Sequence, residues 1–145
     1  MEPLNLNDYI LEKKYWAVGS SYGGIDDHTE EFLANSQWVE GWGVMGDTQN
    51  QRKLEEVEIG DILVMKSSAT RGVNHAITFT RIKAIGIVLN KVNYFTFSVK
   101  WFNTIKFPLD FDGIRYSRTI EQLREDNLKS YVKQFIDEQD IRESN

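Results

Sequence analysis

The sequence contains no cysteine and no long apolar run. Without cysteine, the chain can form neither a disulfide framework nor a thiolate zinc site, and nothing indicates an oxidising compartment. No apolar segment approaches the roughly 20 residues that a membrane-spanning helix needs. The N-terminal segment 1-MEPLNLNDYILEKKYW-16 also lacks the basic start and apolar core of a signal peptide. We therefore expect a cytoplasmic protein that does not enter a membrane.

Motifs for common catalytic chemistry are missing as well. The chain has two histidines, His28 and His75, and no serine lies in a sequence that resembles a nucleophile elbow. His28 could ligate a metal with Asp26 and Asp27, but acidic residues before a helix are typical of capping. The glycines of 19-GSSYGG-24 are not followed by the Gly-Lys-Ser/Thr of a P-loop. We expect no catalysis, no cofactor and no metal ion.

The chain is long enough for one domain. It has 145 residues, of which 41% are hydrophobic and 27% are charged, as in an ordinary globular protein. We expect a single domain over residues 1–136. The polar residues 137–145 are expected to form a tail or the start of a linker to a following domain.

Charge is distributed unevenly along the chain. Residues 1–61 contain 4 basic and 13 acidic residues, a net charge of −9. Residues 62–106 contain 7 basic and no acidic residues, and residues 107–145 contain 6 basic and 9 acidic ones. Phosphates respond to local charge within a Debye length of about 8–10 Å, so the central segment could carry a nucleic-acid-binding surface. The alternative, that Lys-rich strands simply have a solvated face, stays open.

The hydrophobic pattern predicts an α+β fold. The run 15-YWAVGSS-21 indicates a buried strand that leads into a Ser/Gly turn, and Asp27 with Glu30 has the spacing of a capping box. A short helix would then end near Asn35 and be followed by a loop that contains Trp38 and Trp42.

Several strands and a final helix are expected after this loop. The run ILVM over 62–65 predicts a strand buried on both faces, and a polar loop follows over 67–75. A long strand over 77–89 would turn Thr78, Thr80 and Lys83 to water and bulge or bend at Gly86. It would pair with a strand over 94–102, and a further strand is expected near 114–117. The C-terminal helix would follow Thr119, with an apolar stripe at Leu123, Leu128, Tyr131, Val132, Phe135 and Ile136. Together these elements predict a small, curved, mostly antiparallel, barrel-like sheet flanked by short helices and a C-terminal helix.

An ordered set of segments resembles the EVE and YTH domains of the PUA-like superfamily. These segments are 15-YWAVGSSYGG-24, the short helix, Trp38 with Trp42, 60-GDILVMKSS-68, 83-KAIGIVL-89 and 97-FSVKW-101. The closer likeness is to the N-terminal specificity domains of McrB-type modification-dependent restriction systems, and 115-RYSRTIEQL-123 looks like their closing stretch. The resemblance covers about residues 14–123. It implies a DNA-binding module that flips a modified, methylated base into an aromatic cage, with a motor ATPase domain in the same full-length polypeptide.

The resemblance also implies roles for single residues. Trp38 matches the tryptophan that forms one cage wall in YTH domains, and Val39 matches the residue that contributes there through its backbone. Ser20 and Ser21 fall in the turn that places polar groups on the base edge, although this chain has serine where those domains have asparagine. Candidates for the second wall are Trp42, Tyr22 and Tyr94. A core position is the alternative for Trp38 and Trp42, and it is the expected position for Trp16 and Trp101.

Several basic residues are candidates for contacts with phosphate groups. Lys66, Arg71, His75, Arg81 and Lys83 could contact phosphates around the base pocket. A stand-alone PUA-like module that binds modified RNA or a small nucleotide is the rival function, and a protein-interaction domain is a third possibility. The sequence leaves open whether 6-methyladenine, 5-methylcytosine or hydroxymethylcytosine would be read.

Overall fold

The computed structural model describes residues 13–22, 26–41, 46, 48–102 and 108–143. The side chains of Tyr22 and Asp26 and those of residues 140–143 lie outside this description. Trp42, a candidate for the second cage wall, also lies outside the described residues, as does the side chain of the second candidate, Tyr22.

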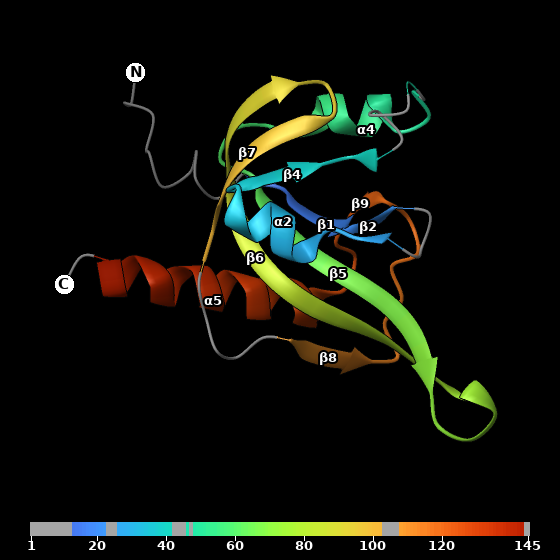
Figure 1. Ribbon diagram of the computed structural model, residues 1–145. Helices are drawn as coiled ribbons and strands as arrows, with labels where there is room; N and C mark the ends of the chain where they lie inside the picture. Colours follow the sequence, from blue (N-terminus) through green and yellow to red (C-terminus); the bar gives the residue numbers. More distant parts are fainter. Residues whose placement is uncertain (1–12, 23–25, 42–45, 47, 103–107, 144–145) are drawn as a thin grey trace, which may run out of the picture.

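The fold is α+β and is built on one strongly curled sheet of mixed pairing (Figure 1). Its strands are ordered β4-β7-β6-β5-β1-β9, and β8 pairs with β6 outside this order. The strands are β1 (Tyr15–Gly19), β4 (Gln37–Val39), β5 (Ile62–Arg71), β6 (Ile77–Asn93), β7 (Thr96–Trp101), β8 (Leu109–Asp112) and β9 (Ile120–Gln122). Pairing is parallel between β1 and β5 and antiparallel elsewhere in this sheet. The predicted fold class, with its curved and mostly antiparallel sheet, is confirmed.

Short helices and a small ribbon flank the sheet. The ribbon pairs β2 (Ser21–Tyr22) with β3 (Asp26–Asp27). The helices are α2 (Thr29–Ala34), α4 (Gln51–Glu56), the 3-10 turn η1 (Val73–His75) and the C-terminal α5 (Asp126–Glu143). In Figure 1, α5 crosses beside the sheet on the side away from α4. Among the described helices, none combines the length and apolar character needed to cross a membrane.

Both faces of the central strands are buried. Successive residues of a strand point to opposite faces, so neighbours in β1 and β5 enter different cores. Trp16 and Leu63 belong to the first core, which also receives side chains from α2 and α4. Ala17 and Val64 belong to the second core, which α5 covers. The expectation that the run ILVM is buried on both faces is confirmed.

One short segment and one side chain of the sheet differ from expectation. Residues 37–39 form β4, an edge strand in which Trp38 pairs with Phe97, although the sequence predicted a loop. The glycines that suggested the loop begin only at Gly41, after the strand has ended. In β6, Thr80 is buried and donates a hydrogen bond to the carbonyl of Ile114 over 2.7 Å instead of facing water. A hydroxyl with such a partner is stable in the interior.

The C-terminal third also differs. Residues 114–117 form no strand and instead connect β8 to β9. Helix α5 begins at Asp126, later than expected, and continues to Glu143, past the predicted end near residue 136. Residues 126–143 contain neither glycine nor proline, and Glu, Gln and Arg favour helix, so the helix extends beyond its buried stripe. The predicted stripe itself is buried at Leu128, Val132, Phe135 and Ile136.

Gly86 is required by close packing and not by the bulge that its position suggested. Register shifts in β6 fall elsewhere, at Val88/Asn90 and Lys91/Asn93, and in its pairing with β5 at Met65/Lys66. A Cβ at residue 86 would lie 2.7 Å from both Trp101 Cε3 and Val99 Cγ1. The Trp101 side chain therefore occupies the space that any larger residue would need.

We expect Gly86→Ala to lower the free energy of unfolding by about 1–3 kcal/mol, as overpacking of a core does. Urea denaturation measures this loss. Gly19→Ala is the matched control, because its Cβ would meet nothing closer than 3.9 Å. Equal stability losses in the two variants would contradict the packing explanation.

Candidate functional site

A polar cavity of about 420 Å³ lies beside the carboxyl end of β1. Its volume falls within the range of about 300–1,000 Å³ that small-molecule sites occupy. Three segments line it, namely the end of β1 with the start of β2, the middle of β5, and the connection from β8 to β9. The lining residues are Gly19, Ser20, Ser21, Lys66, Ser67, Ser68, Arg115, Tyr116, Ser117, Arg118 and Thr119. Hydroxyl groups and cations therefore dominate the wall.

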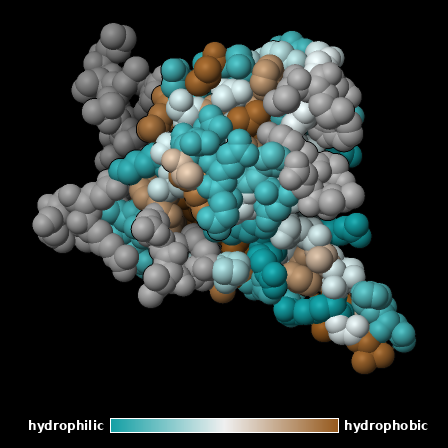
Figure 2. Space-filling view, viewed as in Figure 1, coloured by the Kyte–Doolittle hydropathy of each residue, from teal (hydrophilic) through white to brown (hydrophobic). Residues whose placement is uncertain are grey.

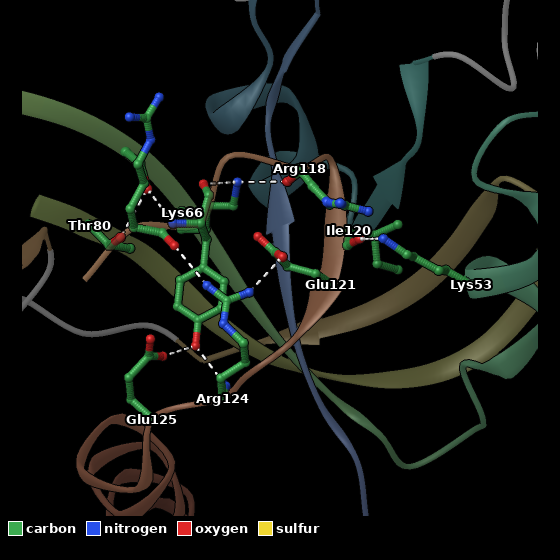
Figure 3. Close-up of polar contacts among 11 residues, drawn as sticks. Lys53, Lys66, Thr80, Arg118, Ile120, Glu121, Arg124 and Glu125 are labelled. Carbon is green, nitrogen blue, oxygen red and sulfur yellow. Dashed lines mark hydrogen bonds and ion pairs between the residues drawn. The ribbon is translucent and has the colours of Figure 1, made fainter. Parts of the chain in front are cut away.

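Backbone and side-chain hydrogen bonds hold these three segments together. Gly19 lies opposite Lys66 in the parallel β1–β5 pair, and its N–H donates to the Thr119 carbonyl over 2.9 Å. The Tyr116 N–H donates to Ser68 Oγ over 3.0 Å. Lys66 Nζ donates to the carbonyls of Tyr116 and Arg118 over 2.7 and 2.8 Å (Figure 3). The connection over 113–119 is thus fixed to β5 mainly by a lysine side chain.

Lys66 is a buried cation, with only 6% of the residue exposed. Burial lowers the pKa of its ammonium to about 8, because the charged form loses hydration, and the positive charge of Lys83 acts in the same direction. The carboxylate of Glu121 on β9 acts against this effect and raises the pKa. The ammonium is therefore much easier to deprotonate than that of a surface lysine.

The wall that contains Ser20 depends on a second lysine. Lys83 Nζ donates to Ser20 Oγ over 2.9 Å and to Thr29 Oγ1 over 3.2 Å, and it lies 3.6 Å from Asp27 Oδ1. Asp27 also accepts hydrogen bonds from the Thr29 backbone N–H and hydroxyl, which, together with Lys83, lower the pKa of its carboxyl group. Ser20 is 1% exposed, so its hydroxyl serves this network.

The turn before α2 contains the residues expected either to cap the helix or to ligate a metal ion. The N-cap residue of α2 is His28 and not Asp27, so the capping box predicted from Asp27 and Glu30 is wrong. Asp27 instead accepts a hydrogen bond from the N–H of Thr29, the first residue of the helix. Within the described part of the chain, no group of three His, Asp or Glu side chains is placed to hold a metal ion.

The far side of the cavity is fixed through Tyr116 to the residues that directly precede α5. The Tyr116 hydroxyl donates to the Glu125 carboxylate and accepts from the Arg124 N–H (Figure 3). Burial, followed by the bond to Glu125, raises the pKa of this phenol to about 12. The Arg124 guanidinium lies 4.5 Å from the ring centroid. Tyr116 therefore stays neutral and holds the connection in place over a wide pH range.

Trp38 occupies a core position instead of a cage wall. It is 0% exposed and packs against Phe97 in the first core. Its indole N–H donates to the Gly19 carbonyl over 2.8 Å. Trp38 therefore fixes the backbone of Gly19, which lines the cavity. No face of this ring is accessible for stacking on a base. Val39 in β4 and Tyr94 at the β6–β7 turn are half-buried, and neither lines the cavity.

The residues expected to contact phosphate do not share one surface. Lys66 lines the cavity and Lys83 supports it. Arg71 and Arg81 instead form ion pairs with carboxylates of β8, Arg81 Nε lying 2.8 Å from Asp110 Oδ1. His75 is exposed at the tip of the β5–β6 hairpin. The acidic residues of β8 thus offset part of the positive charge that the sequence assigned to residues 62–106.

Two further cations at the cavity were missed in the sequence. Arg115 and Arg118 are exposed and line it from the 113–119 connection. Their signal was a pair of arginines among hydroxyl residues in 115-RYSRT-119, a segment for which the sequence predicted a strand near 114–117.

The tip of the β5–β6 hairpin is the other prominent surface. The hairpin extends away from the body of the fold (Figure 1), and Figure 2 shows apolar side chains at its end. Val73 is 84% exposed and Ile77 is 42% exposed there. The strand β5 reaches Arg71, so part of the expected polar loop over 67–75 is regular hairpin.

We expect Trp38→Ala to lower the free energy of unfolding by about 3–5 kcal/mol, the usual cost of deleting a fully buried aromatic side chain. Thermal or urea denaturation measures it. Tyr94→Ala, at a half-buried position, should cost clearly less. Unchanged stability in Trp38→Ala would indicate an accessible ring and restore the cage-wall interpretation.

Comparison with known proteins adds no family to this description. Neither a scan against protein-family models nor a search of curated proteins gave a match to the chain. The choice of function therefore depends on the geometry of the cavity and on the resemblance in the sequence.

Proposed function

We propose that the chain is a non-catalytic DNA-binding module that takes one modified base into the cavity beside β1. The observation that carries this proposal is the position of the cavity. It lies at the turn after the first strand, where the resemblance to EVE and YTH domains places contacts with the base edge. Ser20 and Ser21, the residues expected there, both line it.

Hydrogen bonding, and not stacking on Trp38, would supply the recognition. A flipped base costs a few kcal/mol of unstacking, and its edge groups must find new partners in the pocket. Ser21 and Ser117 are exposed lining residues whose hydroxyls can both donate and accept. The guanidinium groups of Arg115 and Arg118 can stack on a base or bind a neighbouring phosphate. This wall therefore suits a nucleotide.

The size of the expected preference follows from the modification. One methyl group in a fitted pocket changes the binding free energy by about 1–3 kcal/mol, which corresponds to about 10–200-fold in affinity. A hydroxymethyl group would add a hydrogen-bonding partner for the serine side chains. Because the wall is rich in hydroxyls, we include both kinds of substituent in the proposed ligand class.

A wider role is proposed on the sequence resemblance. The module would serve as the specificity domain of a McrB-type restriction ATPase, with the motor domain in the same full-length polypeptide. The rival function is a stand-alone module that binds modified RNA or a free nucleotide. The cavity volume of about 420 Å³ supports this rival equally, so the two are separated by experiment.

We expect the protein to bind a duplex that carries one modified base at least about tenfold more tightly than the unmodified duplex, the lower limit for one methyl group in a fitted pocket. Fluorescence anisotropy with 6-methyladenine, 5-methylcytosine and hydroxymethylcytosine substrates measures this preference. Ser117→Trp should abolish it, because the large side chain fills the mouth of the cavity.

Ser130→Trp is the matched control for this experiment. Ser130 is an exposed serine on α5 that does not line the cavity, so the preference should survive there. Equal affinity of the wild type for modified and plain duplexes would overturn the proposal. Preferential binding of modified RNA over every DNA substrate would favour the rival function.

A further inference from the structure

We propose that the cavity contains an anion subsite centred on the ammonium of Lys66, and that this subsite takes a phosphoryl group. The inference rests on the proposed function in placing a nucleotide in this cavity, but not on which base is read. The phosphoryl group could belong to a free nucleotide or to the DNA backbone.

The hydrogen bonds of Lys66 are incomplete. A protonated lysine has three N–H donors, and the carbonyls of Tyr116 and Arg118 accept from two of them. No other described residue accepts a hydrogen bond from Lys66. The side chain is nevertheless buried and lines the cavity. One donor of a buried cation is therefore available to a ligand.

The charge of Lys66 is only partly compensated. Within the described ranges it forms no ion pair, and Glu121 acts on it only as a more distant carboxylate. A buried charge without an ionic partner is costly, because it has lost its hydration. An anion seated against Nζ would remove that cost. This distinguishes Lys66 from Lys83, which has the carboxylate of Asp27 within 3.6 Å.

Arginine side chains from the same connection complete the subsite. The guanidinium groups of Arg115 and Arg118 form no hydrogen bond or ion pair with any residue in the described part of the chain. Guanidinium groups bind phosphoryl oxygens in pairs, and both arginines line the cavity. The connection over 113–119 thus presents two unpaired cations on a segment that Lys66 itself holds in place.

Anion binding at Lys66 is coupled to a proton. Because burial lowers the pKa of this ammonium to about 8, the free protein loses the proton as the pH rises above that value. An anion favours the charged form and raises the pKa, so binding above pH 8 takes up a proton. The Tyr116 phenol, with a pKa of about 12, stays neutral over this range. Glu121 on β9 and Lys83 on β6 are the other charged groups that act on Lys66.

Sulfate is a suitable probe, because its charge is constant over the pH range concerned. We expect isothermal titration calorimetry with sodium sulfate to give a constant affinity from pH 6.5 to about 7.5. Above pH 8 the affinity should fall, approaching a tenfold loss per pH unit by pH 9.5. An affinity that does not change with pH would show that the rim arginines alone bind the anion and would overturn the role of Lys66.

Lys66→Met tests the same point by removing the charge while retaining most of the side-chain volume. We expect at least tenfold weaker sulfate binding and loss of the pH dependence. Lys53→Met is the matched control, because Lys53 Nζ also donates to a carbonyl, that of Ile120, but does not line the cavity. Unchanged sulfate affinity in folded Lys66→Met would overturn the proposal. If circular dichroism shows that this variant does not fold, the pH series of the wild type decides.

Competition against bound sulfate shows whether the phosphoryl group comes from a free nucleotide or from the DNA backbone. The same experiment tests the subsite separately from the proposed function. A nucleoside 5′-monophosphate that displaces sulfate, while its nucleoside does not, indicates a terminal phosphate, and displacement only by duplex DNA indicates a backbone phosphate. Either result supports the subsite. If neither displaces sulfate, the inference is overturned. If duplexes compete without any preference for a modified base, the subsite stands and base reading fails.

Discussion

The cavity depends on the contact between the Lys66 ammonium and two backbone carbonyls. The carbonyls of Tyr116 and Arg118 belong to a connection that forms no regular secondary structure, and bonds from Lys66 and Ser68 link it to β5. A lysine is costly to bury, and its lowered pKa expresses that cost. Lys66 therefore both holds the connection against β5 and places a buried positive charge at the cavity wall.

The remaining structure supports this wall from both faces of the sheet. On one face, Trp38 donates to the Gly19 carbonyl from within the first core. On the other, Tyr116 binds Glu125, the residue just before α5, and belongs to the second core. Trp16 and Trp101 use their indole groups in the same way, donating to Asp61 and to the Gln37 carbonyl. The tryptophans of the described chain are thus structural hydrogen-bond donors.

The sequence predicted the features that depend on local periodicity. These include the doubly buried strand, the apolar alternation of Phe97 and Val99, and the buried stripe of the last helix. It could not predict contacts between distant residues, such as Arg81 with Asp110 or Lys66 with Tyr116, 50 residues apart. The charge count along the sequence could not show that the acidic strand β8 pairs with β6 and places its carboxylates beside Arg71 and Arg81. The three-residue strand that contains Trp38 could not be predicted either, because the glycines that follow it closely indicated a loop. The resemblance predicted that Ser20 and Ser21, in the turn after the first strand, belong to the binding site, and both line the cavity.

The central claim is that ligand binds in the cavity beside β1 and not at the hairpin tip or on the tryptophans. A titration of ¹⁵N-labelled protein with a modified-base duplex, followed by amide chemical shifts, tests it most directly. The account predicts that the largest shifts occur at residues 19–21, 66–68 and 115–119, the three segments that line the cavity. Shifts confined to residues 72–76 of the hairpin, with the cavity segments unchanged, would contradict it.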